Sequence, residues 1–390
     1  MPVLSKRALE GLRTYQYKPA GYTVLDDWHQ PFWNWCTELL PRWLAPNLIT
    51  LTGVFGLTVA YLVSWAYLPS MEGDAPRWVY AGCGLACLAY LHLDCLDGKQ
   101  ARRTSSSSPL GQLFDHGCDA LAVHLVVTML AASISGGFSW QTVAGHMAIM
   151  GPWVAAHWEE YHTGVMLYGN GYWGVTEANY LMVAVHLFTA AVGPGFWRWR
   201  VADMLHTKAA PWPLRADAHI FDVVLVVISG FAVQQIAGQV WRVFFTRISE
   251  RMPAAERGHK QLGRPAAARH LSQLLAVLGL CSIALLEACS GGVSQARATL
   301  VTAGLAYAVQ ATKLIMDHMA KEPFEALGWP LALLALNIVC RRAAIPWLAA
   351  YVWGVAAIML VGYLHYITNV IGEICAFLGI ACLTIKQAPS

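Results

Sequence analysis

Long apolar segments recur along the chain, and the short stretches between them hold most of the charged residues. A helix that crosses a bilayer needs about 20 mostly apolar residues, so each long segment predicts one membrane-spanning helix. The ninth of these segments is the weakest because Arg341 and Arg342 interrupt it, and residues 370–386 either extend the tenth helix or form a separate interfacial helix. The pattern predicts an all-α integral membrane protein with about ten transmembrane helices. The apolar segments are residues 48–69, 78–95, 112–135, 140–157, 179–197, 220–245, 270–290, 297–318, 327–344 and 346–369.

A different pattern precedes the first predicted span, between Leu25 and Trp43. Aromatic and leucine side chains alternate there with acidic and basic ones. This mixture is typical of an amphipathic helix that lies in the membrane interface, with its apolar side chains in lipid and its charges in water. We expect this interfacial helix on the same face of the membrane as the N-terminus.

Composition supports a membrane protein and excludes other classes. The chain is 57% hydrophobic and 13% charged, whereas a soluble domain carries about 25% charged residues, so a soluble enzyme is excluded. The net charge of +3 is too small for a nucleic-acid-binding surface, and we expect no nucleic-acid partner. Most of the ten cysteines lie in or beside apolar segments, where they are expected to be reduced packing residues.

Basic residues are unevenly distributed among the predicted loops. Residues 247–269 contain six of them, and Lys99, Arg102 and Arg103 follow the second span. These two loops share a side with both termini, and the positive-inside rule places that side in the cytosol. The fifth loop argues against this orientation, because it holds four basic residues on the opposite side: Arg198, Arg200, Lys208 and Arg215.

Four aspartates stand at the facing ends of the second and third predicted spans: Asp94, Asp97, Asp115 and Asp119. An Asp inside a spanning helix costs about 2.5–3.5 kcal/mol on insertion scales, so the group needs compensation unless it lies at the water boundary and is solvated. The spacings i, i+3 and i, i+4 put each pair on one helical face. Two helices can then direct all four carboxylates to one point.

An all-oxygen cluster of this kind suits Mg²⁺, Mn²⁺ or Ca²⁺. Four carboxylates carry a charge of −4, which two divalent cations neutralise. Two metals about 3.5–4 Å apart can clamp the attacking and leaving oxygens of a phosphoryl transfer. Gly98 and Gly111 leave room for a ligand beside the acids, and Arg102 offers a planar fork suited to phosphate.

The clearest resemblance to a known family lies in residues 94–119. They read Asp94-x2-Asp97-Gly98-x2-Ala101-Arg102-x8-Gly111-x3-Asp115-x3-Asp119, which resembles the full motif of the CDP-alcohol phosphotransferase family. The stretches GKQARRT, SSSPLGQLFDHGCDA, LPRWLAPNLIT and WEEYHTG are similar to eukaryotic choline and ethanolamine phosphotransferases, including the plant aminoalcohol enzymes. The similarity covers most of the chain and weakens after about residue 250.

The resemblance implies a reaction and a set of site residues. Phosphocholine or phosphoethanolamine would be transferred from CDP-choline or CDP-ethanolamine to diacylglycerol, with release of CMP. Two Mg²⁺ ions, with Mn²⁺ as a possible substitute, would bind the four aspartates, and the CDP part would contact Asn47, Gly98, Ala101, Arg102 and Gly111. Asn47 is alternatively the N-cap of the first span. The resemblance also implies a homodimer in the endoplasmic reticulum or Golgi membrane, with the active site facing the cytosol.

The diacylglycerol hydroxyl needs a proton acceptor, and His116 is the predicted general base because imidazole titrates near working pH. The His of FDHG has this role in the resembling enzymes, and the family suggests Glu177 as the residue that orients it; Asp119 is the second candidate base. Interfacial solvation explains His157, Glu159, Glu160 and His162 as well as proximity to substrate does. No role follows from the sequence for three ionisable residues in later spans: His318, His365 and Glu373.

These inferences divide the chain into three parts. Residues 1–47 form a cytosolic N-terminus with the interfacial helix, residues 48–245 a catalytic membrane domain with spans 1–6, and residues 246–390 hold spans 7–10 and a tail. Two alternatives remain open. A CDP-diacylglycerol-dependent phosphatidyltransferase of the same family would carry the CDP on the lipid, although such relatives are much shorter. A cation channel or transporter would spread its acids along a permeation path, whereas here they converge.

Overall fold

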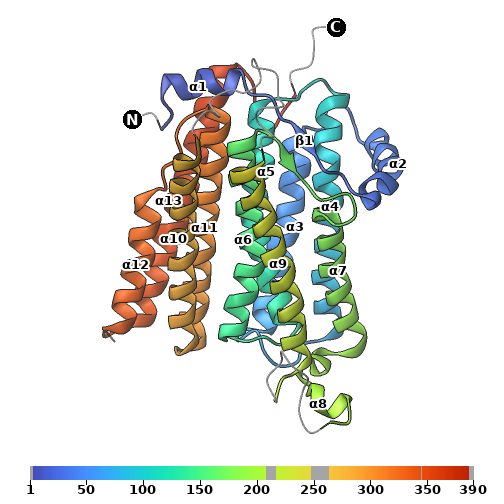
Figure 1. Cartoon of the computed structure of the whole chain (residues 1–390), viewed down its shortest axis with the longest axis vertical. Coiled ribbons are helices and arrows are strands. Elements are labelled where there is room, and N and C mark those ends of the chain that lie inside the picture. The colour runs from blue at the N-terminus through green and yellow to red at the C-terminus, as the bar shows by residue number, and fades with distance from the viewer. Residues whose placement is uncertain (1–2, 208–216, 247–262, 344, 386–390) are drawn as a thin grey trace.

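The computed structural model describes residues 3–207, 217–246, 263–343 and 345–385. Each predicted apolar segment forms one helix, and these helices run lengthwise side by side (Figure 1). The chain is therefore an all-α integral membrane protein, as predicted. The helices are α3 (Pro46–Tyr67), α4 (Arg77–Arg103), α5 (Pro109–Ser133), α6 (Trp140–Thr163), α7 (Val175–Val192), α9 (Ile220–Phe245), α10 (Gly263–Cys289), α11 (Val293–Ala320), α12 (Gly328–Arg342) and α13 (Leu348–Leu378).

Within the described residues, eight of these helices are long and apolar enough to cross a membrane. The other two are α6, whose end carries Glu159 and Glu160, and α12, which has 15 residues. The weakness expected of the ninth segment thus corresponds to a short helix that ends at Arg342. Residues after 370 extend the tenth helix as far as Leu378 and do not form a separate interfacial helix.

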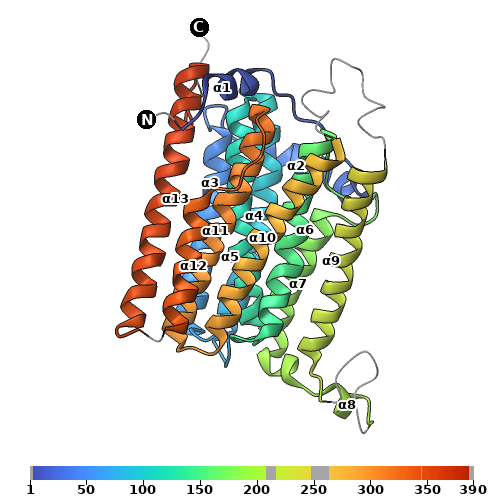
Figure 2. The same cartoon turned by 60° about the vertical axis from the view of Figure 1, so that its left-hand side comes forward.

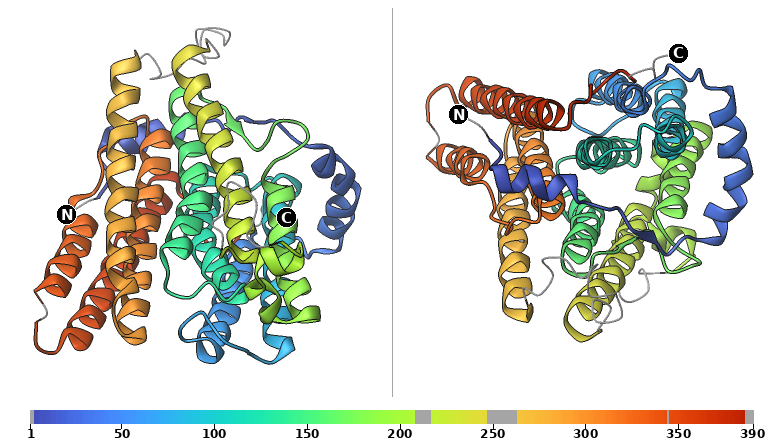
Figure 3. Two further views of the ribbon diagram at one scale, coloured as in Figure 1. Left: turned by 60° about the horizontal axis from the view of Figure 1, so that its bottom comes forward. Right: turned by 90° about the horizontal axis from the view of Figure 1, so that it is seen from above.

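Smaller elements complete the described structure. The short helices are α1 (Lys6–Arg13), α2 (Val24–Leu39), the 3-10 helix η1 (Pro194–Arg198) and α8 (Val201–Met204). Strands β1 (Pro19–Ala20) and β2 (Met166–Leu167) pair in parallel. The predicted interfacial helix corresponds to α2, which lies at the edge of the bundle (Figure 3, right) and exposes Trp28, Trp35 and Leu39.

Both ends of the described chain lie at the same end of the bundle, where α1 crosses the tips of other helices (Figure 2). The Glu373 carboxylate on α13 accepts hydrogen bonds from the backbone N–H groups of Val3 (2.6 Å) and Leu4 (2.8 Å). Gly11 packs so closely on α11 that an added Cβ would stand 1.9 Å from the carbonyl oxygen of Ala320. Glu373 therefore anchors the N-terminal segment across the end of the bundle that holds both termini.

Helix α11 lies in the interior and contacts α5, α6, α10 and α13. Its most apolar stretch is 89% buried, against 11–61% for the other seven candidate spans in the described chain. At the end of the bundle opposite the termini, the buried Arg297 guanidinium donates to the carbonyl oxygens of Leu68 (2.5 Å) and Pro69 (2.7 Å), just beyond the end of α3. Arg297 thereby caps α3 and ties the C-terminal helices to the first span.

Arg297→Met is expected to lower the free energy of unfolding by about 2–4 kcal/mol, because two buried carbonyl groups would lose their charged donor. Thermal unfolding in detergent, followed by tryptophan fluorescence, measures the effect. The matched control is Arg198→Met. Arg198 is half-exposed and lies 3.7 Å from the exposed Asp74, so its loss should change stability by no more than about 0.5 kcal/mol. Equal effects of the two substitutions would contradict the capping role.

Candidate active site

Three of the four motif aspartates meet at one point. The carboxylate oxygens of Asp94 and Asp97 on α4 and of Asp115 on α5 lie within 4.8 Å of one another. The i, i+3 spacing on α4 directs both side chains to the face that meets α5, as the sequence predicts. Asp119, one turn further along α5, accepts a hydrogen bond from the Tyr90 hydroxyl at 2.5 Å. The cluster lies at the same end of the bundle as the two termini.

Asp97 is buried and the other motif aspartates are half-buried, and two of their oxygen atoms have no partner within the described residues. Asp97 is 6% exposed, so the alternative of simple solvation at the water boundary is wrong for this residue. Asp97 Oδ2 accepts a hydrogen bond from the Thr50 hydroxyl. The Oδ1 atoms of Asp94 and Asp115 are buried and have no hydrogen-bond partner in the described part of the chain. Because buried carboxylates need a counter-charge, this all-oxygen set fits divalent cations of the Mg²⁺ type.

A cavity of about 580 Å³ opens beside the acid cluster. Asp97 and Asp115 reach its wall, and so do the Ser- and Thr-rich loop between α4 and α5 and the segment after α13. All five residues that the sequence predicts for the CDP part line this cavity: Asn47, Gly98, Ala101, Arg102 and Gly111. The predicted metal and nucleotide residues therefore share one cavity.

Asn47 does not cap the first span. The cap position of α3 is Ala45, and Pro46 occupies the first helical position, where its missing N–H is no loss. The Asn47 side-chain amide instead donates to the carbonyl oxygen of Cys382, 2.9 Å away in the segment that follows α13. The alternative role as N-cap is wrong, and Asn47 joins the first span to the C-terminal segment at the cavity wall.

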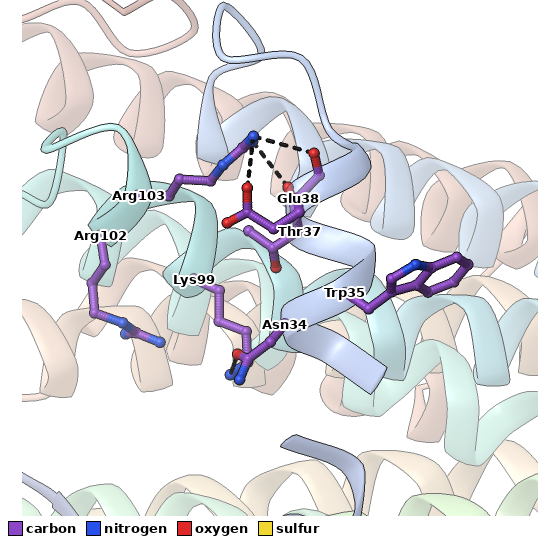
Figure 4. A pocket seen from close by; sticks show the side chains of 7 residues that line it. All are labelled: Asn34, Trp35, Thr37, Glu38, Lys99, Arg102 and Arg103. Atoms are coloured by element: carbon purple, nitrogen blue, oxygen red, sulfur yellow. Dashed lines mark hydrogen bonds and ion pairs between the residues drawn. The ribbon is translucent and has the colours of Figure 1, made fainter. Parts of the chain in front are cut away.

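The basic residues at the end of α4 face a second cavity of about 370 Å³, between α4 and α2 (Figure 4). Arg103 donates to the carbonyl oxygens of Thr37 (2.9 Å) and Leu40 (2.7 Å) and so caps the end of α2. Lys99 Nζ donates to the side-chain oxygens of Gln30 and Asn34. Arg102 points away from these partners in Figure 4 and lines both cavities. Of the three, Arg102 is the residue available for a phosphate.

His116 is buried at the edge of the acid cluster. Its Nε2 lies 2.7 Å from Gln112 Nε2 and 3.8 Å from Asp115 Oδ2. The ring meets the rings of Tyr17 and His157 edge to face, with centroids 5.6 and 5.0 Å away. The side chain is thus held on several sides, as a positioned proton acceptor would need to be.

Glu177 lies in a different environment. Its carboxylate accepts a hydrogen bond from the Gly174 backbone N–H at 2.9 Å and forms part of the cap of α7. In the described part of the chain, it forms no hydrogen bond or ion pair with His116. The orienting role of Glu177 stays a prediction. Gln112, four residues before His116 on the same helical face, contacts that side chain directly.

Sequence reasoning missed several contacts around the site. Thr50 and Tyr90 hold two of the aspartates, and nothing in their spacing from the motif indicates this. Tyr15 and Tyr17 line the 580 Å³ cavity from the N-terminal segment. Burial raises the pKa of the Tyr17 hydroxyl, which hydrogen-bonds the hydroxyl of Tyr168 and stays neutral. These tyrosines come from parts of the sequence that carry no motif.

The structure shows the surroundings of the other ionisable residues that the sequence analysis singled out. Glu159 is 2% exposed, and its Oε2 lies 2.9 Å from Arg242 Nη2 on α9. Glu160 is 3% exposed and lies 3.5 Å from His318. Interfacial solvation is therefore the wrong explanation for both glutamates. His365 is exposed on α13 and contacts Asn369 one turn away.

Comparison with known proteins identifies the family. The family described as "CDP-alcohol phosphatidyltransferase" matches residues 43–228. An "Uncharacterized CDP-alcohol phosphatidyltransferase class-I family protein 3" of Dictyostelium discoideum is 30% identical over 99% of both chains, and so is a "Choline/ethanolaminephosphotransferase 1" of Arabidopsis thaliana. A human "Cholinephosphotransferase 1" is 38% identical over 51% of this chain and 48% of its own. Because relatives of this family match at 30% identity over 99% of both chains, the chain belongs to the CDP-alcohol phosphatidyltransferase family and is a membrane phosphotransferase.

Proposed function

We propose that the enzyme transfers phosphoethanolamine or phosphocholine from CDP-ethanolamine or CDP-choline to diacylglycerol. The hydroxyl oxygen of diacylglycerol would form a bond to the phosphorus next to the aminoalcohol, the bond between that phosphorus and the CMP oxygen would break, and CMP would leave. The observation that carries the proposal is the buried acid cluster at the wall of a cavity lined by Asn47, Gly98, Ala101, Arg102 and Gly111. The names of the full-length plant relatives agree with these substrates.

In this proposal the chain's own side chains bind the diphosphate and accept a proton. Asp94, Asp97, Asp115 and Asp119 would hold two Mg²⁺ ions, or Mn²⁺ in their place. Such ions, when bound, neutralise charge on the diphosphate and on the departing CMP. Arg102 would contact a phosphate oxygen through its planar fork. His116 would take the hydroxyl proton, and its contact with Gln112 supports a fixed ring orientation.

The proposed location is the endoplasmic reticulum or Golgi membrane, with the active site facing the cytosol and the enzyme acting as a homodimer. The acid cluster lies late in α4 and early in α5, and these parts of the two helices are at the same end of the bundle as both ends of the described chain (Figure 1), which supports the side given by the positive-inside rule. Some of the basic residues lie outside the described residues: Arg247, Arg251, Arg257 and Lys260, which favour this orientation, and Lys208 and Arg215, which argue against it. The membership in an enzyme family favours this proposal over a channel or transporter.

The test is an assay of the purified full-length protein in nanodiscs. Diacylglycerol is supplied with either CDP-ethanolamine or CDP-choline in Mg²⁺, and CMP release is measured. A second arm supplies CDP-diacylglycerol with inositol or glycerol 3-phosphate, the substrates of the alternative phosphatidyltransferase. We expect CMP release only in the first arm, and loss of activity in excess chelator or in Ca²⁺, whose larger radius displaces the clamped oxygens. Turnover confined to the second arm would overturn the proposal.

Tyr90→Phe is expected to raise the Mg²⁺ concentration for half-maximal activity by about 10–100-fold, because Asp119 loses the hydroxyl that orients it. A Mg²⁺ titration of CMP release measures this shift. Tyr366→Phe is the matched control, since the Tyr366 hydroxyl is buried without a hydrogen-bond partner in the described residues. An unchanged Mg²⁺ dependence for Tyr90→Phe would remove Asp119 from the metal site.

A further inference from the structure

A second group of titratable side chains lies behind the acid cluster and is built from three helices. His116 comes from α5, His157 and Glu160 from α6, and His318 from α11, and these helices pack against one another (Figure 2). The exposed fractions are 4% for His116, 2% for His157 and 3% for Glu160, and the His318 side chain is 8% exposed. We call these four residues the His–Glu cluster.

His157 and His318 both lie at ion-pair distance from the Glu160 carboxylate. His157 Nδ1 lies 3.6 Å from Glu160 Oε2, and His318 Nε2 lies 3.5 Å from Glu160 Oε1. Hydrogen bonds between such atoms are about 2.7–3.2 Å long. Four ligands at about 2.0–2.2 Å from a tetrahedral ion lie about 3.3–3.6 Å from one another. The two measured distances are of this size, but they run to different oxygens of Glu160 and so do not by themselves define four ligands around one ion.

Two further observations point into the same space. One ligand atom each from His116, His157 and Glu160 lies within 4.8 Å of the other two. His157 Nδ1 is fully buried and has no hydrogen-bond partner in the part of the chain that the structure describes. Around the cluster, the Tyr15 hydroxyl lies 3.3 Å from Glu160 Oε1. The ring of Trp153 packs against the ring of His157, with 4.4 Å between the ring centroids. Outer contacts of this kind orient the ligands of protein metal sites.

We propose that the His–Glu cluster is a second cation site that takes Zn²⁺ or a similar transition-metal ion. Imidazole nitrogens with one carboxylate suit Zn²⁺, whereas the aspartate cluster offers only oxygen, which suits Mg²⁺. The two sites share a wall, because Asp115 and His116 are neighbours in sequence. Donor chemistry separates them: Mg²⁺ at millimolar concentration fills the first site and leaves the second to ions that prefer nitrogen.

A consequence for activity rests on the proposed function. A bound Zn²⁺ would hold the His116 imidazole through a ring lone pair, and the ring would then be a poor acceptor for the diacylglycerol proton. Zn²⁺ therefore inhibits CMP release even when Mg²⁺ saturates the aspartate cluster. Mg²⁺ would therefore activate CMP release, and Zn²⁺ would inhibit it.

Binding is tested without reference to activity, by titrating Co²⁺ into the full-length protein in nanodiscs at millimolar Mg²⁺. Tetrahedral Co²⁺ with nitrogen and oxygen ligands absorbs visible light, and Zn²⁺ should displace it. We expect one saturable site, weakened at least about 10-fold by Glu160→Gln and by His157→Asn. His146→Asn, a matched control nearer the beginning of α6, should bind as the wild type does. X-ray absorption of the Zn²⁺-loaded wild-type protein should report nitrogen and oxygen ligands, a result that does not depend on the folding of any variant.

Three outcomes would overturn the site. They are no saturable binding of Co²⁺ or Zn²⁺, sulfur ligation that assigns the ion to one or more of the ten free cysteines, and binding unchanged in both Glu160→Gln and His157→Asn. The activity arm measures inhibition of CMP release by Zn²⁺ in the wild type, in Glu160→Gln and in His146→Asn. We expect inhibition that is weakened only in Glu160→Gln. Zn²⁺ binding at the cluster without inhibition would support the site and contradict the role of His116 as base.

Discussion

Asp97→Asn is expected to lower the kcat/KM of CMP release by about 10³-fold or more, while the protein still inserts and folds. A metal ligand contributes several kcal/mol of transition-state stabilisation, and each 1.36 kcal/mol corresponds to about tenfold in rate. Asp97 is the most buried of the three converging carboxylates, and it accepts a hydrogen bond from the Thr50 hydroxyl. The amide keeps the size of the side chain and relieves repulsion from Asp94 and Asp115, so stability should not fall.

The measurement compares CMP release and thermal unfolding of Asp97→Asn with those of Asp74→Asn. Asp74 is an exposed aspartate in the loop between α3 and α4, at the opposite end of the bundle, and its substitution should leave activity unchanged. Wild-type turnover by Asp97→Asn would contradict the two-metal site. A loss of activity together with a loss of folding would be resolved by Asp115→Asn, for which the same result is expected.

His116→Ala should lower kcat by about 10²–10⁴-fold and leave CDP-alcohol binding nearly intact, because a general base acts on the proton and not on the nucleotide. CMP release and CDP-alcohol affinity are measured across a Mg²⁺ series. His365→Ala, an exposed histidine on α13, is the control and should be unaffected. A deficit of His116→Ala at low Mg²⁺ that disappears as Mg²⁺ is raised would instead make His116 a metal ligand. Near-normal turnover at every Mg²⁺ concentration would transfer the base role to Asp119.

The sequence was sufficient to predict the spanning helices and the meeting of three of the four aspartates, because both follow from local spacing. The apolar segments predict the ten helices of the bundle, and the i, i+3 spacing of Asp94 and Asp97 predicts that both face α5. The lengths of the helices were harder to predict from the sequence. Arg341 and Arg342 marked the ninth segment as weak, and the structure shows why, since α12 ends at Arg342 after 15 residues.

The remaining features depend on contacts between distant parts of the chain, for which local spacing carries no signal. Asn47 meets Cys382 across 335 positions, and Glu373 binds backbone groups at Val3 and Leu4. Glu160 meets His318 only because α11 packs beside α6. Asn47 also shows how a local rule can mislead, because Asn is a favoured N-cap and yet Ala45 occupies that position.

The hydrogen bond between Asn47 and Cys382 has a consequence for hybrid enzymes. A chimera that joined the first six spans of this protein to the last four of a relative would keep every motif residue. It would nevertheless exchange the backbone that holds Asn47 and one side of the 580 Å³ cavity, which Ile380 and Ile385 help to line. Substrate preference in such hybrids should therefore follow the donor of the C-terminal segment as well as the donor of the motif.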